Sequence, residues 1–159
     1  MKRIENIIKN SEYMAYVKKI EALEIDRKFC RHGLGHLLDV ARIGYIINLE
    51  ENLGYSKDVI YAMGLFHDIG REKEYEKKIS HHEAGAHIAR KLLAKLDFTE
   101  NEIEDIAFAI SNHKNYSNDK KDLSYILYKA DKLSRNCFDC NMYDECYWDE
   151  NIKNKTIFY

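Results

Sequence analysis

The sequence predicts an all-α protein, and three observations support this fold class. The chain contains no proline and only seven glycines, so few positions interrupt a helix. Its apolar residues recur at three- and four-residue spacings, and no segment alternates as a half-buried strand does. Its 159 residues favour one domain whose core needs no disulfides. We expect a single-domain helical bundle over residues 1–135 and an irregular, cysteine-containing tail over residues 136–159 packed on it.

Two long helices are expected first. A stripe that includes Tyr13 and Ile20 predicts a helix over residues 12–29. A second stripe predicts a helix over residues 33–52, and Gly54 is expected to end it.

A short helix and a loop follow. Ser56 is an expected N-cap for a helix over residues 57–67, because its hydroxyl can accept a hydrogen bond from the first turn. Gly70 comes next, and the strongly charged residues 71–78 are expected to form a loop.

Three more helices complete the bundle. Two of them open on a capping-box signature, a serine or threonine followed three residues later by glutamate. These are Ser80 with Glu83 before a helix over residues 81–96, and Thr99 with Glu102 opening a helix to residue 113. The polar residues 114–121 are expected to form a loop, and residues 123–134 carry the last apolar stripe.

Composition limits the partners. The formal net charge is -2, which gives no electrostatic case for nucleic acid or an anionic membrane. The N-terminus lacks the apolar core of a secretory signal, and no apolar run reaches the roughly 20 residues that span a bilayer. We therefore expect a cytoplasmic protein with reduced thiols, whose four cysteines bind metal or pack.

The histidines indicate a metal site. His36, His82 and His113 fall on the apolar stripes of different helices, and Asp131 lies on the stripe of the last one. A single histidine on such a stripe is usually a hydrogen-bonded core residue. Several imidazoles and two carboxylates in one core need a compensating charge, and a divalent metal supplies it.

The dipeptide His67-Asp68 supports this interpretation. It lies where an apolar helix is expected to end, before Ile69-Gly70. Side chains at a helix end can converge on one cation or on two adjacent ones, whereas neighbours within a helix point about 100° apart.

The wider pattern resembles a known superfamily. The segments HLLDVARIGY, GLFHDIGRE, HHEAGAHIA, AISNHK and YKADKLSR, between Phe29 and Arg135, resemble the HD-domain superfamily of metal-dependent phosphohydrolases. The resemblance implies an HD-type helical bundle in which one metal is held by His36, His67, Asp68 and Asp131. It also implies a second metal at His82 and His113, with Asp68 bridging the two.

Within that superfamily, HHEAGA, AISNHK and YKADKLSR most resemble the bacterial symmetrical diadenosine-tetraphosphate hydrolases. The chain departs from that group after His113, where Lys114-Asn115-Tyr116-Ser117 replaces a threonine-rich turn ending in glycine, and again in the tail. The resemblance implies a small phosphorylated substrate, a nucleotide or a dinucleoside polyphosphate. A 5'-nucleotidase, a phosphodiesterase and a non-catalytic nucleotide sensor are alternatives on the same fold. A homodimer remains open.

The expected chemistry is hydrolysis assisted by two divalent ions. Such ions lower the pKa of a water and neutralise charge on the phosphoryl oxygens, while Asp68 orients the nucleophile. Iron, manganese, cobalt or nickel suits a mixed imidazole and carboxylate site. Arg71, Lys114 and Arg135 are the expected phosphate ligands, although each could simply be solvated.

Three other histidines have less definite roles. His81 competes with His82 for the inward position, since a one-residue change of helix phase would exchange them. His32 is expected to support the metal ligands, and His87 is expected to be exposed.

The tail carries a second candidate metal site. Cys137, Cys140 and Cys146 have the spacing C-x2-C-x5-C, which suits a tetrahedral zinc ion, and Cys30 could complete four thiolates. The alternative is that these thiols pack with the aromatic side chains of the tail.

Overall fold

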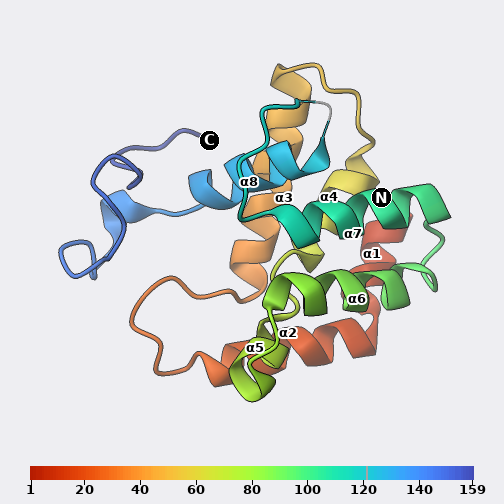
Figure 1. Cartoon of the computed structure of the whole chain (residues 1–159), viewed down its shortest axis with the longest axis horizontal. Coiled ribbons are helices and arrows are strands. Elements are labelled where there is room, and N and C mark those ends of the chain that lie inside the picture. The colour runs from red at the N-terminus through yellow and green to blue at the C-terminus, as the bar shows by residue number, and fades with distance from the viewer. Residues whose placement is uncertain (121) are drawn as a thin grey trace.

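The computed structural model describes residues 1–120 and 122–159 and is all-α over them (Figure 1). The expected loop residue Lys121 lies outside the described residues. The helices are α1 Lys2–Lys9, α2 Ser11–Leu23, α3 Leu34–Glu50, α4 Lys57–Phe66, α5 Arg71–Lys77, α6 His81–Leu93, α7 Glu100–Asn112 and α8 Leu123–Leu133, followed by the 3-10 helix η1 Cys137–Asp139. The fold class predicted from the sequence is confirmed.

Two helices were not expected. α1 is short and buries only Ile4 and Ile7, so it shows no long apolar stripe. α5 occupies the segment expected to be a charged loop, and that expectation was wrong. Its one buried side chain is Glu72, which pairs with Lys19 of α2 at 2.6 Å. Ion pairs rather than apolar contacts dock this helix, so apolar periodicity could not reveal it.

The second helix ends earlier than expected. α2 stops at Leu23, and residues 24–33 form an irregular connection rather than the end of a helix reaching residue 29. Glu24 explains the break. Its carboxylate is buried and accepts hydrogen bonds from the backbone N–H of His32 and from the Tyr75 hydroxyl, which turns the chain inward.

The helix caps follow the sequence in part. Ser56 accepts a hydrogen bond from the backbone of Val59, and Thr99 with Glu102 forms the expected capping box. The Ser80 side chain makes no cap hydrogen bond, so the capping box expected there was wrong. Asn52, with φ 54°, takes the left-handed position after α3, two residues before Gly54.

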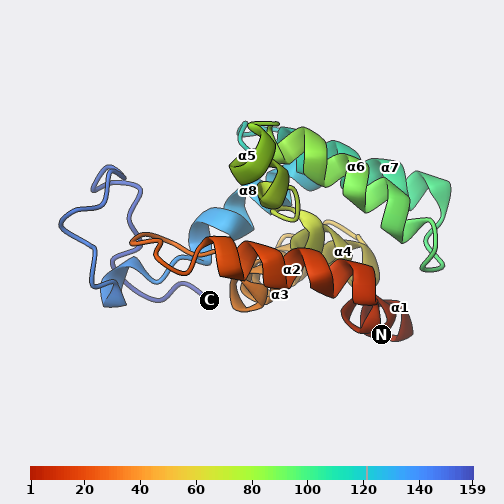
Figure 2. The ribbon, with the colours of Figure 1, turned by 90° about the horizontal axis from the view of Figure 1, so that it is seen from below.

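The helices pack in two layers with the site between them. α6 and α7 lie over α2, α3 and α4 in Figure 2, and the tail extends beyond the end of α8. α3 and α4 approach closely because Gly64 has no side chain. A Cβ atom there would lie 2.6 Å from Ala41 Cα and 2.7 Å from Ala41 N. The buried Tyr13 hydroxyl donates to the Leu65 carbonyl and ties α2 to α4.

The tail has little regular structure. Apart from η1, its described residues form turns and extended segments, and large apolar side chains such as Ile157 and Phe158 stay exposed. The division into a body over residues 1–135 and a tail over residues 136–159 stays a prediction. In the described part of the chain, no helix combines the length and apolar character needed to cross a bilayer.

We predict that Gly64→Ala destabilises the protein by about 1–3 kcal/mol, because the new methyl group collides with the α3 backbone. Gly35→Ala is the control, since a Cβ at Gly35 meets nothing within 4 Å. Urea unfolding at a fixed metal concentration measures both. Equal stability of the two variants would contradict the close approach of α3 and α4.

We also predict a pH-dependent link between α3 and α8. Hydrogen bonds from Lys120 and Lys129 lower the pKa of Glu51 to about 2. The pairing is therefore complete above the unfolded value of 4.5 and is lost as the pH falls toward 2. A double-mutant cycle of Glu51→Gln and Lys129→Met should give a coupling of about 0.2–1 kcal/mol at neutral pH. A coupling that persists unchanged in acid would contradict this pairing.

Candidate metal centre

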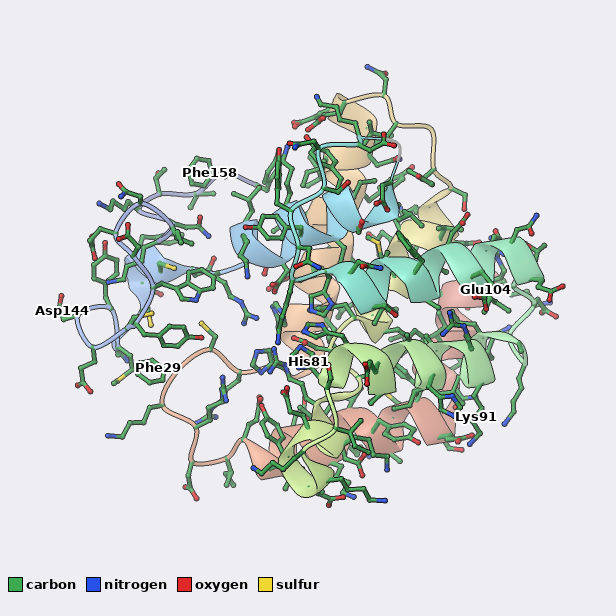
Figure 3. All side chains as sticks on the ribbon, viewed as in Figure 1. Phe29, His81, Lys91, Glu104, Asp144 and Phe158 are labelled. Carbon is green, nitrogen blue, oxygen red and sulfur yellow. The ribbon has the colours of Figure 1, made fainter. Side chains whose placement is uncertain are left out.

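The site surrounds the carboxylate of Asp68, which lies directly after α4 and is 1% exposed. Six imidazoles from five segments of the fold gather around it. Figure 3 shows His81 turned inward from the start of α6. The histidines are His32 from the connection before α3, His36 of α3, His67 after α4, His81 and His82 of α6, and His113 after α7.

A close backbone crossing brings these segments together. A side chain at Gly70 would collide with the backbone of His81 and Gly85. The chain after α4 can therefore lie against the first turn of α6 only because residue 70 is glycine. This crossing places His67 and Asp68 opposite the two histidines that open α6.

The first donor group consists of His36, His67 and Asp68, whose ligand atoms lie within 4.8 Å of one another. The Oδ2 atom of Asp68 is 3.2 Å from His67 Nε2 and 3.7 Å from His36 Nε2. Asp131 of α8 joins them, with its Oδ1 3.4 Å from His36 Nε2. The structure thus brings together the four residues expected at the first metal.

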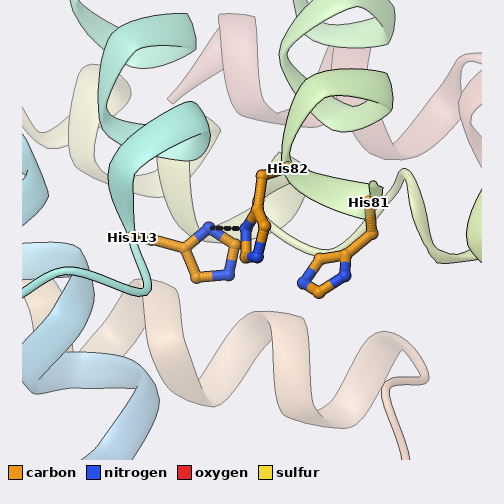
Figure 4. A group of neighbouring side chains, drawn as sticks. All are labelled: His81, His82 and His113. Carbon is orange, nitrogen blue, oxygen red and sulfur yellow. Dashed lines mark hydrogen bonds between the residues drawn. The ribbon is translucent and has the colours of Figure 1, made fainter. Parts of the chain in front are cut away.

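The second donor group consists of His81, His82 and His113, again within 4.8 Å (Figure 4). His81 Nε2 lies 3.5 Å from the other Asp68 oxygen, Oδ1. The two oxygens of Asp68 therefore face two different donor groups, which is the arrangement a bridging carboxylate requires.

Hydrogen bonds orient most of the rings the same way. The Nδ1 atoms of His67 and His113 each lie 2.7 Å from a backbone carbonyl, those of Gly64 and Ile110. His32 Nδ1 lies 2.5 Å from the Glu24 carboxylate. With the proton on Nδ1, the Nε2 lone pair of each ring is free to bind metal, as in many metal sites.

His81 and His82 differ in this respect. His81 Nδ1 lies 2.8 Å from Glu74, so its Nε2 is free in the same way. His82 Nδ1 lies 3.1 Å from the Nδ1 of His113, whose proton already points at Ile110 (Figure 4). The Nδ1 of His82 can therefore only accept a hydrogen bond from His113, and the proton of the neutral His82 ring must be on its Nε2. The hydrogen bonds thus favour His81 as the ligand and His82 as its neighbour.

Burial keeps most of these rings neutral. It lowers the pKa of His32 to about 4, and together with the neighbouring His113 it lowers the pKa of His82 to about 3. Burial and His67 lower the pKa of His113 to about 4. Neutral imidazole is the form that binds metal, so these rings are ready to bind at neutral pH.

The carboxylate stays ionised in spite of its burial. Burial raises the pKa of Asp68, but His67 and Arg71 outweigh it and hold the pKa well below its usual range. Burial lowers the pKa of His67, but Asp68 outweighs it and the pKa is raised. Asp131 is held ionised in the same way by His36 and Arg135 against its burial.

These donors fit divalent transition metals. The buried atoms His67 Nε2 and His81 Nε2 have no hydrogen-bond partner, although buried polar atoms are normally paired. Imidazole nitrogens and carboxylate oxygens are the usual ligands of such ions. A cation at each donor group would satisfy these atoms and offset the buried carboxylates.

Two arginines lie close to the donor groups. Arg71 is mostly buried, with its Nε 2.9 Å from Asp68 Oδ1. Arg135 places one guanidinium nitrogen 2.9 Å from His36 Nε2 and 3.3 Å from Asp131 Oδ1. Because a metal would need those same two atoms, Arg135 and an ion at the first group compete for them.

A cavity of about 290 Å³ opens over the centre. Arg71, Lys114 and Arg135 all line it, together with His81, His113 and Asp131. Phe29 also lines it and, from the tail, Cys146, Tyr147 and Trp148. The expected phosphate ligands therefore share one cavity with the metal ligands. His87 is exposed on α6, away from that cavity.

The expected ligand set left out two contributors. His81 was set aside in favour of His82, although both are buried. Its signal was the adjacent pair His81-His82 at a helix start, where side-chain direction is not fixed by helix phase. The other is Glu24. His32 was expected to support the metal ligands, but nothing in the sequence marked Glu24 as the partner of an imidazole eight residues later.

Comparisons with known proteins agree with this fold. The HD domain family matches residues 33–136. An uncharacterized protein of Clostridium beijerinckii is 42% identical over 161 residues, covering 100% of both chains. A predicted HD superfamily hydrolase from an uncultured Thermotogales bacterium has a TM-score of 0.63 at 21% identity, covering 96% of this chain and 87% of that one, a likeness of fold.

A third relative is much longer than this chain. Ribonuclease Y of Mycoplasma mycoides is 31% identical over 118 residues, which are 74% of this chain. The match spans only 26% of that protein's length.

We predict about two transition-metal ions per chain after purification without chelators, one for each donor group. His36→Ala and His113→Ala should each lose about one ion, and exposed His87→Ala should lose none. Within the second group, His81→Ala should lose the ion and His82→Ala should retain it. Elemental analysis measures all five variants. Wild-type protein that holds no ion under these conditions would contradict the site.

Proposed function

The chain belongs to the HD domain family, and from that premise we propose that it is a metal-dependent phosphohydrolase acting on a nucleotide or a dinucleoside polyphosphate. The ions proposed are iron, manganese, cobalt or nickel, which suit imidazole and carboxylate ligands. The observation that carries the proposal is the Asp68 carboxylate, whose Oδ2 faces His36 and His67 while its Oδ1 faces His81.

Bound divalent ions would lower the pKa of a water and neutralise charge on the phosphoryl oxygens. The protein supplies the remaining steps. Asp68 holds its charge at neutral pH and can orient the attacking water. Arg71, Lys114 and Arg135 line the same cavity and can bind the phosphoryl oxygens that acquire charge in the transition state.

The aromatic residues of the cavity support a nucleotide as the substrate. Phe29, Tyr147 and Trp148 line the same cavity as the basic residues, and Lys132 Nζ lies 5.1 Å from the centre of the Trp148 ring. Aromatic side chains of this kind can stack on bases, and each stacked base contributes about 1–3 kcal/mol. The cavity thus offers cations for a phosphate and aromatic side chains for a base.

The segments HHEAGA, AISNHK and YKADKLSR support a dinucleoside tetraphosphate as the first substrate to test. Residues 114–117 depart from that group's pattern and lie next to the cavity-lining Lys114, so the neighbouring nucleotides belong in the same panel.

Hydrolysis of a phosphodiester is the second candidate. It is favoured by the similarity to part of ribonuclease Y, a protein named for its action on RNA. The same donor groups could act on a diester, because a metal centre does not by itself distinguish ester types.

A substrate panel with manganese, cobalt or iron(II) tests these assignments. It should include nucleoside monophosphates, a dinucleoside tetraphosphate, a short RNA and bis(p-nitrophenyl) phosphate. Metal-dependent release of phosphate or of nucleoside diphosphate, lost in Asp68→Ala and kept in His87→Ala, is the expected result. Tight nucleotide binding without turnover under every metal would instead identify a nucleotide sensor, and turnover of the diesters alone would favour the second candidate.

We predict that Arg71→Ala lowers kcat/KM by roughly 10²–10³-fold, because a buried cation that meets charge in the transition state is lost. Arg71→Lys should recover part of this loss, since lysine keeps the charge without the planar fork. Arg90→Ala is the control, because Arg90 pairs with Glu104 on the exposed side of α6 and α7. Unchanged kcat/KM in Arg71→Ala would remove Arg71 from the substrate site.

A further inference from the structure

All four cysteines of the chain line one cavity. This second cavity, of about 390 Å³, lies between the tail and the segment that leads into α3. Cys30 comes from that segment, and the other three come from the tail. Figure 3 shows Phe29, the neighbour of Cys30, beside the tail. Chance packing would not be expected to bring every thiol of a 159-residue chain to one cavity.

We propose that Cys30, Cys137, Cys140 and Cys146 bind one zinc ion, which fastens the tail to the helical body. Zinc with four thiolates is a common structural site, and C-x2-C is its usual ligand spacing. The ion would be separate from the metals of the histidine centre and would not depend on the activity proposed above.

Local backbone structure brings two of the cysteines together. η1 covers Cys137–Asp139, and Cys140 N–H donates to the Cys137 carbonyl at 3.2 Å. The bond closes one turn between Cys137 and Cys140, which brings the backbones of these two cysteines close together. The turn then continues, with Tyr143 N–H bonded to the Cys140 carbonyl and Cys146 N–H to the Tyr143 carbonyl.

The cavity lining carries charges of both signs. Arg135 and Lys153 line it, and so do Asp39 and Asp139. Burial raises the pKa of the Cys30 thiol, and Arg135 opposes this shift. Arg135 is therefore a cation close enough to the cysteines to favour a thiolate there.

Few apolar contacts hold the tail in place, so it needs another stabilising interaction. Its large side chains Phe138, Tyr147 and Ile157 are exposed, so burial of apolar surface does little to hold it. Polar contacts hold two points. Asn154 donates to the carbonyls of Lys132 and Arg135, and Lys153 donates to that of Tyr143. Short segments without a core usually rely on a metal or disulfides, and free thiols make a metal the candidate here.

The sulfur atoms must still move inward. Both groups of donors that lie within 4.8 Å among the described residues belong to the histidine centre. The thiols surround their cavity more loosely, and three of them are on a segment of turns that can contract around an ion. Zinc binding would therefore order the tail, releasing thiol protons as it does so.

The test counts zinc that is bound by thiols. The protein is expressed with added zinc and purified under reducing, chelator-free conditions, and a mercurial reagent then releases thiolate-bound metal to a chromogenic chelator. We expect about one zinc ion from the native chain and also from His67→Ala. We expect none from Cys140→Ser and one from Phe138→Ser, a matched change at an exposed tail residue.

Cobalt substitution gives an independent readout. Cobalt(II) at the site should show thiolate-to-metal charge-transfer absorption and the visible bands of a tetrahedral ion, and His67→Ala should keep both. Circular dichroism should show that Cys140→Ser retains its helices, because the helical body lies outside the tail. If Cys140→Ser does not fold, the presence or absence of the charge-transfer band in the cobalt titration of the native chain decides whether the thiols bind metal.

Two outcomes would overturn the proposal. One is native protein with four reactive thiols, no thiol-released zinc and no charge-transfer band on cobalt addition. The other is zinc that stays in Cys140→Ser but leaves in His67→Ala, which would place the ion in the histidine centre. Neither readout measures turnover, so failure of the phosphohydrolase proposal would leave this one standing.

Discussion

The buried carboxylate of Asp68 is the constraint on which the arrangement of the helices depends. An ionised group almost out of contact with water costs several kcal/mol unless opposite charge or hydrogen-bond donors surround it. Here the compensation comes from His67 after α4, from Arg71 and from His36 of α3. The polar centre of the bundle and its candidate active site are therefore the same place. Helix packing that serves this carboxylate also brings the metal ligands together.

Two glycines make that packing sterically possible. Gly64 lets α4 lie against Ala41 of α3, and Gly70 lets the chain after α4 cross the start of α6. Between these two contacts lie only the last residues of α4 and then His67, Asp68 and Ile69. The dipeptide is thus held on both sides by backbone rather than by side chains. Rigid placement of this kind keeps ligand atoms where a metal needs them.

The sequence predicted the parts of the structure that follow apolar periodicity or local capping. The apolar stripes indicated α3, α4, α6, α7 and α8, and the cap at Thr99 formed as expected. The failures share a cause. α5 and the connection after α2 are set by buried polar contacts, those of Glu72 with Lys19 and of Glu24 with His32. Contacts between residues distant in sequence leave no periodic signal in the sequence. The choice between His81 and His82 also depends on such contacts, because His81 lies against Glu74 and Asp68.

Substrate choice must come from outside the metal ligands, because a metal centre acts on many phosphate esters alike. Lys114 follows α7, and Tyr147 and Trp148 belong to the tail, so these parts of the cavity wall come from segments outside the metal-binding donor groups. Arg135 joins these parts physically. It lines both cavities while contacting His36 and Asp131. An ion at the first donor group would need those same two atoms, so a bound ion and this contact of Arg135 would exclude each other. The guanidinium would then turn away from the two ligand atoms, and both cavities that it lines are within its reach.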